Sequence, residues 1–324
     1  MSGKPIFLFS LPRSGSTLLQ RMLSCHSEIC TESELWFLLP HIDAIKNKYS
    51  KSLYSFNSLR NATKSLLAQL PDGEDDYYHG LRRMADHIYD RLAKNGETYV
   101  LDKTPRYYFI ISEIEKLYPD AKFIFLFRHP FAVAASITES FNRGRLGDYT
   151  HRIDLFEGPK MLAEGYKNMR APSIALRYED LVDDSEACLK QICNYLEIPF
   201  EIEMVQNFIK VPVGAMGDQF GSRQLSSISS SSSDKWKDVF STQYRKKYLE
   251  RYITSLDSST VKIMGYDYDE IIRDLSELDC KFSLALKDRW RESMCCIYSA
   301  IEIPLLIEKL KKGRSKNKKH YIHH

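Results

Sequence analysis

The sequence predicts an α/β fold of the P-loop-like type: three layers, with a central, mostly parallel sheet flanked by helices, and a C-terminal helical extension. Short apolar runs at residues 6–9, 98–101 and 122–127 are typical of strands buried on both faces of a parallel sheet. Polar or basic residues follow each run, and two runs lead directly into helical spacing. Because parallel sheets bind ligands outside the carboxyl ends of their strands, we expect the functional site at that edge.

The composition is typical of a globular protein with a large core. The 324 residues are 43% hydrophobic and 27% charged, and we predict a main domain over residues 1–275 followed by an extension over 276–324. The net charge of +3 is too small to indicate a nucleic-acid partner. Seven cysteines form no C-x-x-C pair and no zinc spacing, and neither a signal peptide nor a long apolar run is visible. We therefore expect a reduced, cytoplasmic protein.

The first apolar run leads into a small polar loop and then into helical spacing. Such a strand–loop–helix unit presents free N–H groups and a helix dipole to an anion. Compared with the G-x-x-x-x-G-K-[ST] loop of nucleotide hydrolases, Ser10 replaces the first Gly, Gly15 and Thr17 are kept, and Ser16 replaces the Lys. The missing Lys disfavours ATP or GTP hydrolysis, while Arg13 can still hold an anion. An ordinary strand–turn–helix remains the alternative.

Candidate catalytic residues follow the first two strands. Three carboxylates, at Glu28, Glu32 and Glu34, stand close behind the predicted anion site, where one could act as a general base. Lys103 comes directly after the strand at 98–101 and is a candidate catalytic cation. The alternatives are a solvated acidic loop for the carboxylates and a surface salt bridge for the lysine.

A second strand–helix unit repeats the arrangement of the first. The apolar strand at 122–127 ends in Arg128 and His129, and helical spacing resumes with Ser136 inside it. A further strand is predicted over residues 173–178. Two units that direct basic residues to one sheet edge favour a binding site over an incidental turn.

Two C-terminal segments carry weaker signals. A serine-rich stretch at 222–233, flanked by Arg223 and Lys235, indicates either a linker or a loop that closes over a ligand. The apolar helical pattern from residue 282 ends in a basic run at 311–319. This pattern suits peripheral docking on an anionic membrane or on a partner, but a helix packed on its own domain with a solvated tail is an equal alternative.

Taken together, these motifs resemble the sulfotransferase superfamily that uses 3′-phosphoadenosine 5′-phosphosulfate (PAPS). Residues 11–19 are similar to its 5′-phosphosulfate loop, and residues 125–130 with Ser136 are similar to its 3′-phosphate motif. The segment 177–181 matches a third motif, whose tyrosine lies near the adenosine. Asp218 with the serine-rich stretch and Trp236 resembles the late cofactor-covering loop. The four motifs occur in the right order over residues 5–240.

Within the superfamily, the sequence looks closest to the tyrosylprotein sulfotransferases and to bacterial sulfotransferases of similar layout. The resemblance places the His-x-Glu pattern at His26 and Glu28, the catalytic base at Glu34 and the catalytic lysine at Lys103. The adjacent acids of the protein-tyrosine enzymes are here separated by Ser33, and their secretory features are missing. These departures argue against peptide tyrosine as the acceptor.

The resemblance implies a role for each candidate residue. Glu34, Lys103 and Arg13 would be catalytic, with Glu34 taking the acceptor proton and Lys103 stabilising the leaving bridging oxygen; His26 and His129 are alternative bases. PAPS would be the donor, its desulfated product PAP (adenosine 3′,5′-bisphosphate) would remain, and no metal is required. The implied cofactor-binding residues are Arg13, Ser14, Gly15, Ser16, Thr17, Arg128, Ser136, Tyr178, Arg223, Lys235 and Trp236.

The acceptor is expected to be a glycan or a small metabolite with a free hydroxyl or amine. Arg106, Arg143 and Arg145 could add positive charge for an acidic glycan, which favours carbohydrate. We expect no nucleic-acid partner, and both a homo-oligomer and membrane contact through the C-terminal extension remain open. Two other functions stay as alternatives: a small-molecule kinase on a degenerate P-loop, and a non-catalytic nucleotide-binding or membrane-docking module.

Overall fold

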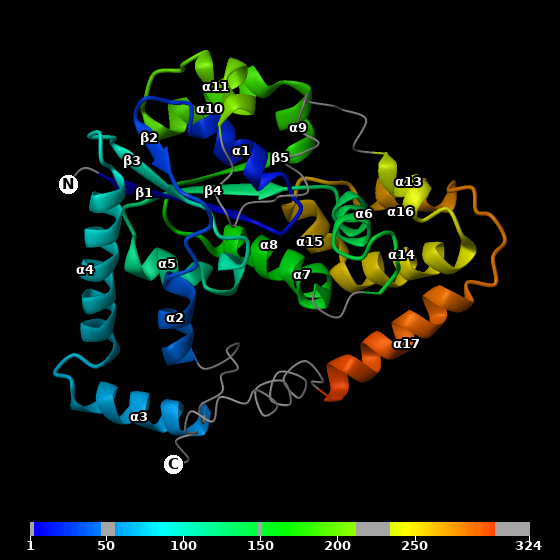
Figure 1. The fold of residues 1–324 in the computed structure, drawn as a ribbon, viewed down its shortest axis with the longest axis horizontal. Coiled ribbons are helices and arrows are strands. Elements are labelled where there is room, and N and C mark those ends of the chain that lie inside the picture. Colours follow the sequence, from blue (N-terminus) through cyan, green and yellow to red (C-terminus); the bar gives the residue numbers. More distant parts are fainter. Residues whose placement is uncertain (1–2, 47–55, 148–150, 212–233, 302–324) are drawn as a thin grey trace, which may run out of the picture.

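The computed structural model describes residues 3–46, 56–147, 151–211 and 234–301. At its centre is a five-stranded sheet in which every neighbouring pair is parallel (Figure 1). In spatial order the strands are β2 (Ile29–Thr31), β3 (Tyr99–Asp102), β1 (Lys4–Ser10), β4 (Lys122–Phe127) and β5 (Ser173–Arg177). The predicted α/β fold with a parallel sheet between helices is therefore confirmed.

The alternation of side chains along β1 divides the core into two layers. Ile6 and Leu8 point to one face, where they pack with apolar residues of the helices above the sheet in Figure 1. Phe7 and Phe9 point to the other face and pack with Phe123, on neighbouring β4. Covering the first face are α1 (Ser16–Leu23), α9 (Tyr178–Asp183), α10 (Ser185–Leu196), α11 (Glu203–Gln206) and the 3₁₀ turn η2 (Phe208–Lys210).

The second face is covered mainly by helices from the middle of the chain. Tyr89 packs edge-on and Tyr118 packs at a tilt against Phe7, and both join this layer to the sheet. The elements of this layer are α2 (Leu38–Lys46), α4 (Glu74–Leu92), η1 (Tyr107–Phe109), α5 (Ile111–Leu117) and α8 (Gly158–Asn168). Next to it, α3 (Phe56–Gln69) lies on the outside of the molecule (Figure 1).

A third apolar cluster lies beyond the carboxyl end of β4 and holds the C-terminal helices. Its centre is formed by Phe131, Trp236 and Tyr252, whose rings are in mutual contact around Phe131. The helices are α6 (Pro130–Ser140), α7 (Arg152–Phe156), α13 (Lys235–Val239), α14 (Gln243–Leu256), α15 (Ser258–Ile263) and α16 (Tyr268–Ser276). The last described helix, α17 (Leu286–Ile301), lies outside this cluster next to α14 (Figure 1).

Four further expectations can be compared with the structure. The division at residues 275 and 276 stays a prediction, with α16 ending at Ser276 and α17 beginning at Leu286. Among the described helices, none has the length and apolar character needed to cross a bilayer. The six cysteines whose surroundings the structure describes are all free thiols. The serine-rich stretch at 222–233 lies outside the described residues.

Candidate active site

The loop between β1 and α1 has the conformation of an anion-binding turn. Arg13 and Gly15 both have positive φ, at 69° and 89°. The Ser14 N–H donates to the Leu11 carbonyl at 3.2 Å, and α1 begins at the next residue after Gly15, Ser16. Leu18 and Leu19 donate the first hydrogen bonds of the helix to the Gly15 carbonyl, so the N–H groups of Ser16 and Thr17 and the helix dipole are available to an anion.

Gly15 is required by contact as well as by conformation. A Cβ atom at this position would lie 2.2 Å from the ring of Tyr178, so no side chain fits. Tyr178 is the first residue of α9 and follows β5. The predicted phosphosulfate loop and the predicted adenosine motif, 163 residues apart by number, are therefore in van der Waals contact at the carboxyl edge of the sheet.

Arg128, which belongs to the predicted 3′-phosphate motif, contacts both of these motifs. Its guanidinium lies 4.3 Å from the centre of the Tyr178 ring, and its Nη1 donates to the Arg13 carbonyl at 2.7 Å. The Arg13 side chain in turn donates from Nε to the Ser136 hydroxyl of α6 at 3.0 Å. Burial lowers the pKa of Arg128. The structure thus brings together Arg13, Gly15, Arg128, Ser136 and Tyr178, as the sequence predicts.

Two buried polar atoms in this cluster point to an anionic ligand. Neither the Ser14 Oγ nor the Arg128 Nε has a hydrogen-bond partner among the described residues. Buried donors of this kind are nearly always paired in folded proteins. Both atoms belong to the motifs predicted to hold phosphate, and phosphate oxygens would satisfy them.

Glu34 and Lys103 form an ion pair beyond β3, which lies on the other side of β1 from β4. Lys103, directly after β3, is only 1% exposed, and its Nζ lies 2.9 Å from the Glu34 Oε1. The other carboxylate oxygen, Oε2, accepts from the Trp36 Nε1 at 2.9 Å. Since both oxygens are engaged, the carboxylate has a fixed orientation. The alternative of a surface salt bridge for Lys103 does not hold, because this lysine is buried.

Trp36 is a site residue that the sequence did not reveal. Its backbone N–H donates to the Thr104 hydroxyl at 3.2 Å, and its φ of 58° is in the left-handed region. This turn directs the indole N–H toward Glu34, two residues earlier. The sequence offers only the proximity of a tryptophan to the acidic segment as a signal.

Gln20 connects the phosphate loop to the catalytic pair. It lies on α1, and its Nε2 donates to the Thr31 hydroxyl at 2.8 Å and to the Glu32 carbonyl at 2.6 Å. The segment that carries Glu34 is therefore attached to the helix that begins at the anion-binding turn. Relative movement of the two halves of the site is restricted as a result.

Asp102 supports Lys103 from inside the sheet. It is fully buried and accepts hydrogen bonds from the hydroxyls of Tyr89 and Tyr107, at 2.8 and 3.2 Å. Burial raises its pKa to about 6, against the opposing effect of these hydrogen bonds and of Lys103. This network fixes the end of β3 from which Lys103 projects.

The two histidines named as alternative bases are held by other contacts. The Nε2 of His26 lies 2.7 Å from the Pro199 carbonyl, and its Nδ1 accepts from the Glu28 backbone N–H at 3.0 Å. The ring of His129 is nearly parallel to that of Trp236, with 6.2 Å between the centres, and burial lowers its pKa to about 4. Among the carboxylates and histidines considered, Glu34 has the direct contact with Lys103.

Ser16 and Thr17 begin α1 directly after Gly15 and so belong to this cluster, but not every predicted residue does. Lys235 is exposed and Trp236 is buried in the third apolar cluster, while Arg223 lies outside the described residues. Arg106 was expected to offer positive charge to an acceptor. Instead its guanidinium pairs with the fully buried Asp154, with 2.8 Å between Nη2 and Oδ2, so its charge is compensated.

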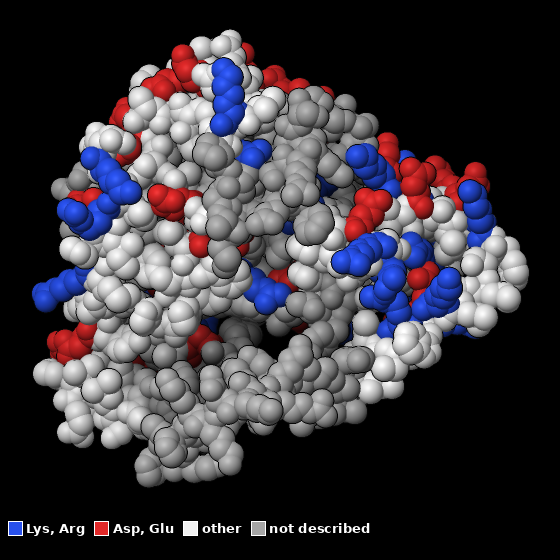
Figure 2. Space-filling model, in the orientation of Figure 1, with Lys and Arg blue, Asp and Glu red and all other residues white. Residues whose placement is uncertain are grey.

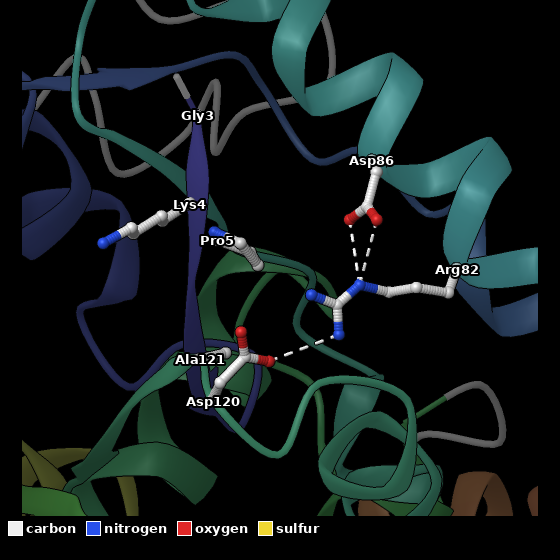
Figure 3. A pocket seen from close by; sticks show the side chains of 7 residues that line it. All are labelled: Gly3, Lys4, Pro5, Arg82, Asp86, Asp120 and Ala121. Atoms are coloured by element: carbon white, nitrogen blue, oxygen red, sulfur yellow. Dashed lines mark hydrogen bonds and ion pairs between the residues drawn. The ribbon is translucent and has the colours of Figure 1, made fainter. Parts of the chain in front are cut away.

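A cavity of about 90 Å³ lies at the opposite edge of the sheet (Figure 3). It is lined by residues at the starts of β1 and β4 and by α4, which are Gly3, Lys4, Pro5, Arg82, Asp86, Asp120 and Ala121. Arg82 points between Asp86 and Asp120 and pairs with both, as Figure 3 shows. Because this is the amino edge, the cavity is separate from the cluster described above.

Across the described residues, no group of three or more histidine, cysteine, aspartate or glutamate side chains has the arrangement of a metal site. The carboxylates of the site are instead engaged by donors: Glu34 by Lys103 and Trp36, and Asp102 by two tyrosines.

Comparisons with known proteins find relatives that include sulfotransferases. Nodulation protein NoeE of Sinorhizobium fredii is 32% identical over 136 residues, which are 42% of this chain and 31% of that protein. Protein-tyrosine sulfotransferase of Drosophila melanogaster is 24% identical over 224 residues, 64% of this chain and 41% of that protein. In the first relatives matched, this chain spans about a third of the protein's length.

Solved structures show the same fold. The sulfotransferase domain from the curacin biosynthetic pathway superposes with a TM-score of 0.51 at 24% identity, covering 82% of this chain and 97% of that domain. The model of the family described as "Sulfotransferase family" matches residues 5–202, which include all three motifs of the carboxyl-edge cluster and the Glu34–Lys103 pair. The chain belongs to the sulfotransferase family.

Proposed function

We propose that the protein is a PAPS-dependent sulfotransferase that moves the sulfuryl group in line to a hydroxyl or amine of an acceptor. The observation that carries this proposal is the position of two features at one edge of the sheet: the ion pair of buried Lys103 with Glu34, and the arginine cluster around Arg128. Gln20 attaches the two to each other. A transferase needs both elements, because the donor must be fixed while the acceptor is deprotonated.

The cofactor side fits a nucleotide with two phosphate positions. When bound, PAPS supplies an activated sulfuryl group, and PAP is the leaving group through its 5′-phosphate. The turn at Arg13–Gly15 with the start of α1 would hold the 5′-phosphosulfate, and Arg128 with Ser136 would hold the 3′-phosphate. Arg128 Nε and Ser14 Oγ, unpaired among the described residues, would gain their partners there. Tyr178, packed on Gly15, would support the adenosine.

The transfer side fits proton removal next to a fixed cation. Glu34 would accept the acceptor proton, and Lys103, 2.9 Å from it, would stabilise negative charge on the bridging oxygen. Trp36 would keep the carboxylate in its orientation through the bond to Oε2. A sulfuryl group carries less charge than a phosphoryl group, so we propose that this transfer proceeds without a metal ion.

For the acceptor we propose a carbohydrate or a small metabolite. Arg143 and Arg145 are exposed in the segment that follows α6, whereas Arg106 is compensated by Asp154. Positive charge for an acidic glycan would therefore come from that segment. The relatives named for protein-tyrosine sulfation make a tyrosine peptide the necessary comparison substrate.

The test is transfer of label from sulfur-labelled PAPS to a panel of sugars, amino sugars, phenols and a tyrosine peptide, with a chelator present. Labelled product with the wild type, and about a hundredfold lower kcat for Glu34→Gln with normal PAP binding, would support the proposal. Glu32→Gln is the matched control, because Glu32 is exposed and lies two residues away. Transfer of the ATP γ-phosphate in magnesium, with none from PAPS, would contradict it and indicate a kinase.

A further inference from the structure

The polar side of helix α17 faces the protein body. Asp288 accepts two hydrogen bonds from Arg245 of α14, at 2.8 and 3.1 Å. One turn later, Glu292 accepts from Tyr244 and Arg251, at 2.7 and 2.9 Å. Asp288 and Glu292 are four residues apart and therefore on one face of the helix. The helix is thus attached by ion pairs and hydrogen bonds, the reverse of the usual apolar attachment.

The opposite side of α17 is apolar and exposed. Leu286, Trp290 and Ile297 follow one another at helical spacing, with exposed fractions of 67, 66 and 46%. Immediately before the helix, Phe282 and Leu284 are 82 and 68% exposed. These five residues, which we call the α17 stripe, include the four most exposed large apolar side chains of the described structure. Large apolar side chains that are exposed together in one segment mark an interaction site.

Cations border the α17 stripe. Lys281, Lys287 and Arg289 are exposed beside it. Figure 2 shows Lys and Arg side chains on the part of the surface that carries α14 and the start of α17. The sequence after the helix continues the same character, because seven of the eleven residues from 309 to 319 are Lys or Arg.

We propose that the α17 stripe docks on an anionic lipid surface, with Trp290 and its apolar neighbours inserted at the level of the headgroups. Tryptophan is favoured at this depth, and apolar side chains bordered by cations are the composition of helices that lie in the membrane interface. A second copy of the chain fits less well, because pairing two α17 stripes would bring the bordering cations of both copies together. Docking would place the catalytic domain at the membrane surface.

The experiment is sedimentation of the full chain with phosphatidylcholine vesicles, prepared with and without phosphatidylglycerol. We expect binding to the anionic vesicles, and at least about tenfold weaker binding for the double variant Leu286→Ser, Trp290→Ala, because both lose inserted apolar surface. The matched control is Leu66→Ser, which removes a leucine of 52% exposure on α3 and should bind as the wild type does. Circular dichroism spectra and thermal melts establish that each variant is folded.

Fluorescence separates insertion from simple charge attraction. Trp290 is the exposed tryptophan of the three in the chain, so its emission should shift to the blue with anionic vesicles, and Trp290→Phe should lose that shift. Binding that the double variant retains in full would overturn the proposal, since the basic sequence alone would then account for it. Self-association that the double variant abolishes, without vesicle binding by the wild type, would overturn it in favour of a second copy.

Discussion

Arg82, at the amino edge of the sheet, and Arg128, at the carboxyl edge, use their charge in opposite ways. At the amino edge, Arg82 donates to the carboxylates of Asp86 and Asp120 and to the Leu117 carbonyl (Figure 3). At the carboxyl edge, Arg128 donates to a backbone carbonyl and stacks on Tyr178, and no carboxylate pairs with it among the described residues. The first arrangement compensates the charge and contributes to stability, whereas the second keeps the charge available for an anion.

The largest expected effect is at Lys103, the buried cation of the carboxyl edge. We predict that Lys103→Met lowers kcat by about a thousandfold, because an electrostatic donor in a buried site is worth two to three orders of magnitude. Arg82→Met, at the other edge, should lower the melting temperature and leave kcat unchanged. Initial rates of sulfuryl transfer and thermal melts measure both, and equal losses of kcat in the two variants would contradict the comparison.

Gly15 offers the second test, through backbone conformation. We predict that Gly15→Ala destabilises the fold by about 3 kcal/mol, because it combines left-handed strain with overlap on the Tyr178 ring. Gly80→Ala on α4 should instead stabilise by about 0.5–1 kcal/mol, since a Cβ there meets open space in a helix. Urea unfolding measures both variants. If Gly15→Ala left the free energy of unfolding unchanged, Tyr178 would not pack on the loop.

Asp102 gives a prediction for the pH dependence of stability. Its pKa is about 6 when folded, above its ordinary value of 3.8, so between these values the folded state holds a proton that the unfolded state lacks. The protonated carboxyl therefore contributes its full share of the free energy of unfolding below pH 4. As the pH rises through 6, this contribution is lost, and the free energy of unfolding falls by about 3 kcal/mol. Asp102→Asn should remove this loss. Urea unfolding at pH 4 and pH 7 measures this: between the two pH values the free energy of unfolding of the variant should rise by about 3 kcal/mol relative to that of the wild type. The same pH dependence in both proteins would contradict the role of burial.

Arg128 gives the smallest of these effects and the most specific one. We predict that Arg128→Met weakens PAP binding by about thirtyfold, the equivalent of about 2 kcal/mol for charge-assisted hydrogen bonds. Arg82→Met should bind PAP as the wild type does, because its guanidinium is already paired at the other edge. Calorimetric titration measures both, and equal affinity in the Arg128 variant would show that this arginine does not hold the nucleotide.

The sequence predicted those parts of the fold that depend on the hydrophobic pattern of a short segment. The strands β1, β3, β4 and β5 fall on the predicted apolar runs. β1, β3 and β4 are buried almost continuously, as inner parallel strands are, whereas β5 at the edge of the sheet alternates between buried and half-buried residues. β2 was missed: three residues, Ile29–Thr31, with only the first fully buried, carry too little periodicity. The end of the last predicted strand was one residue too late, since Tyr178 begins α9.

Contacts between distant residues could not be predicted from pattern alone. The sequence indicated Glu34 and Lys103 separately, but their 2.9 Å contact and the indole of Trp36 depend on how the segment after β2 turns. The same limit applies to Arg106, which looked free in the sequence until the fold placed Asp154 against it. Whether a charge is available for binding depends on the tertiary structure, as Arg82 and Arg128 also show.

The most direct test of the account is calorimetric titration of the protein with PAP in magnesium-free buffer, with ADP as the control nucleotide. The two differ in the position of the second phosphate, and we assign Arg128 and Ser136 to a 3′-phosphate. We predict tight binding of PAP, weak binding of ADP and loss of the difference in Arg128→Met. Binding of ADP equal to or tighter than that of PAP would contradict the assignment of the carboxyl edge to PAPS.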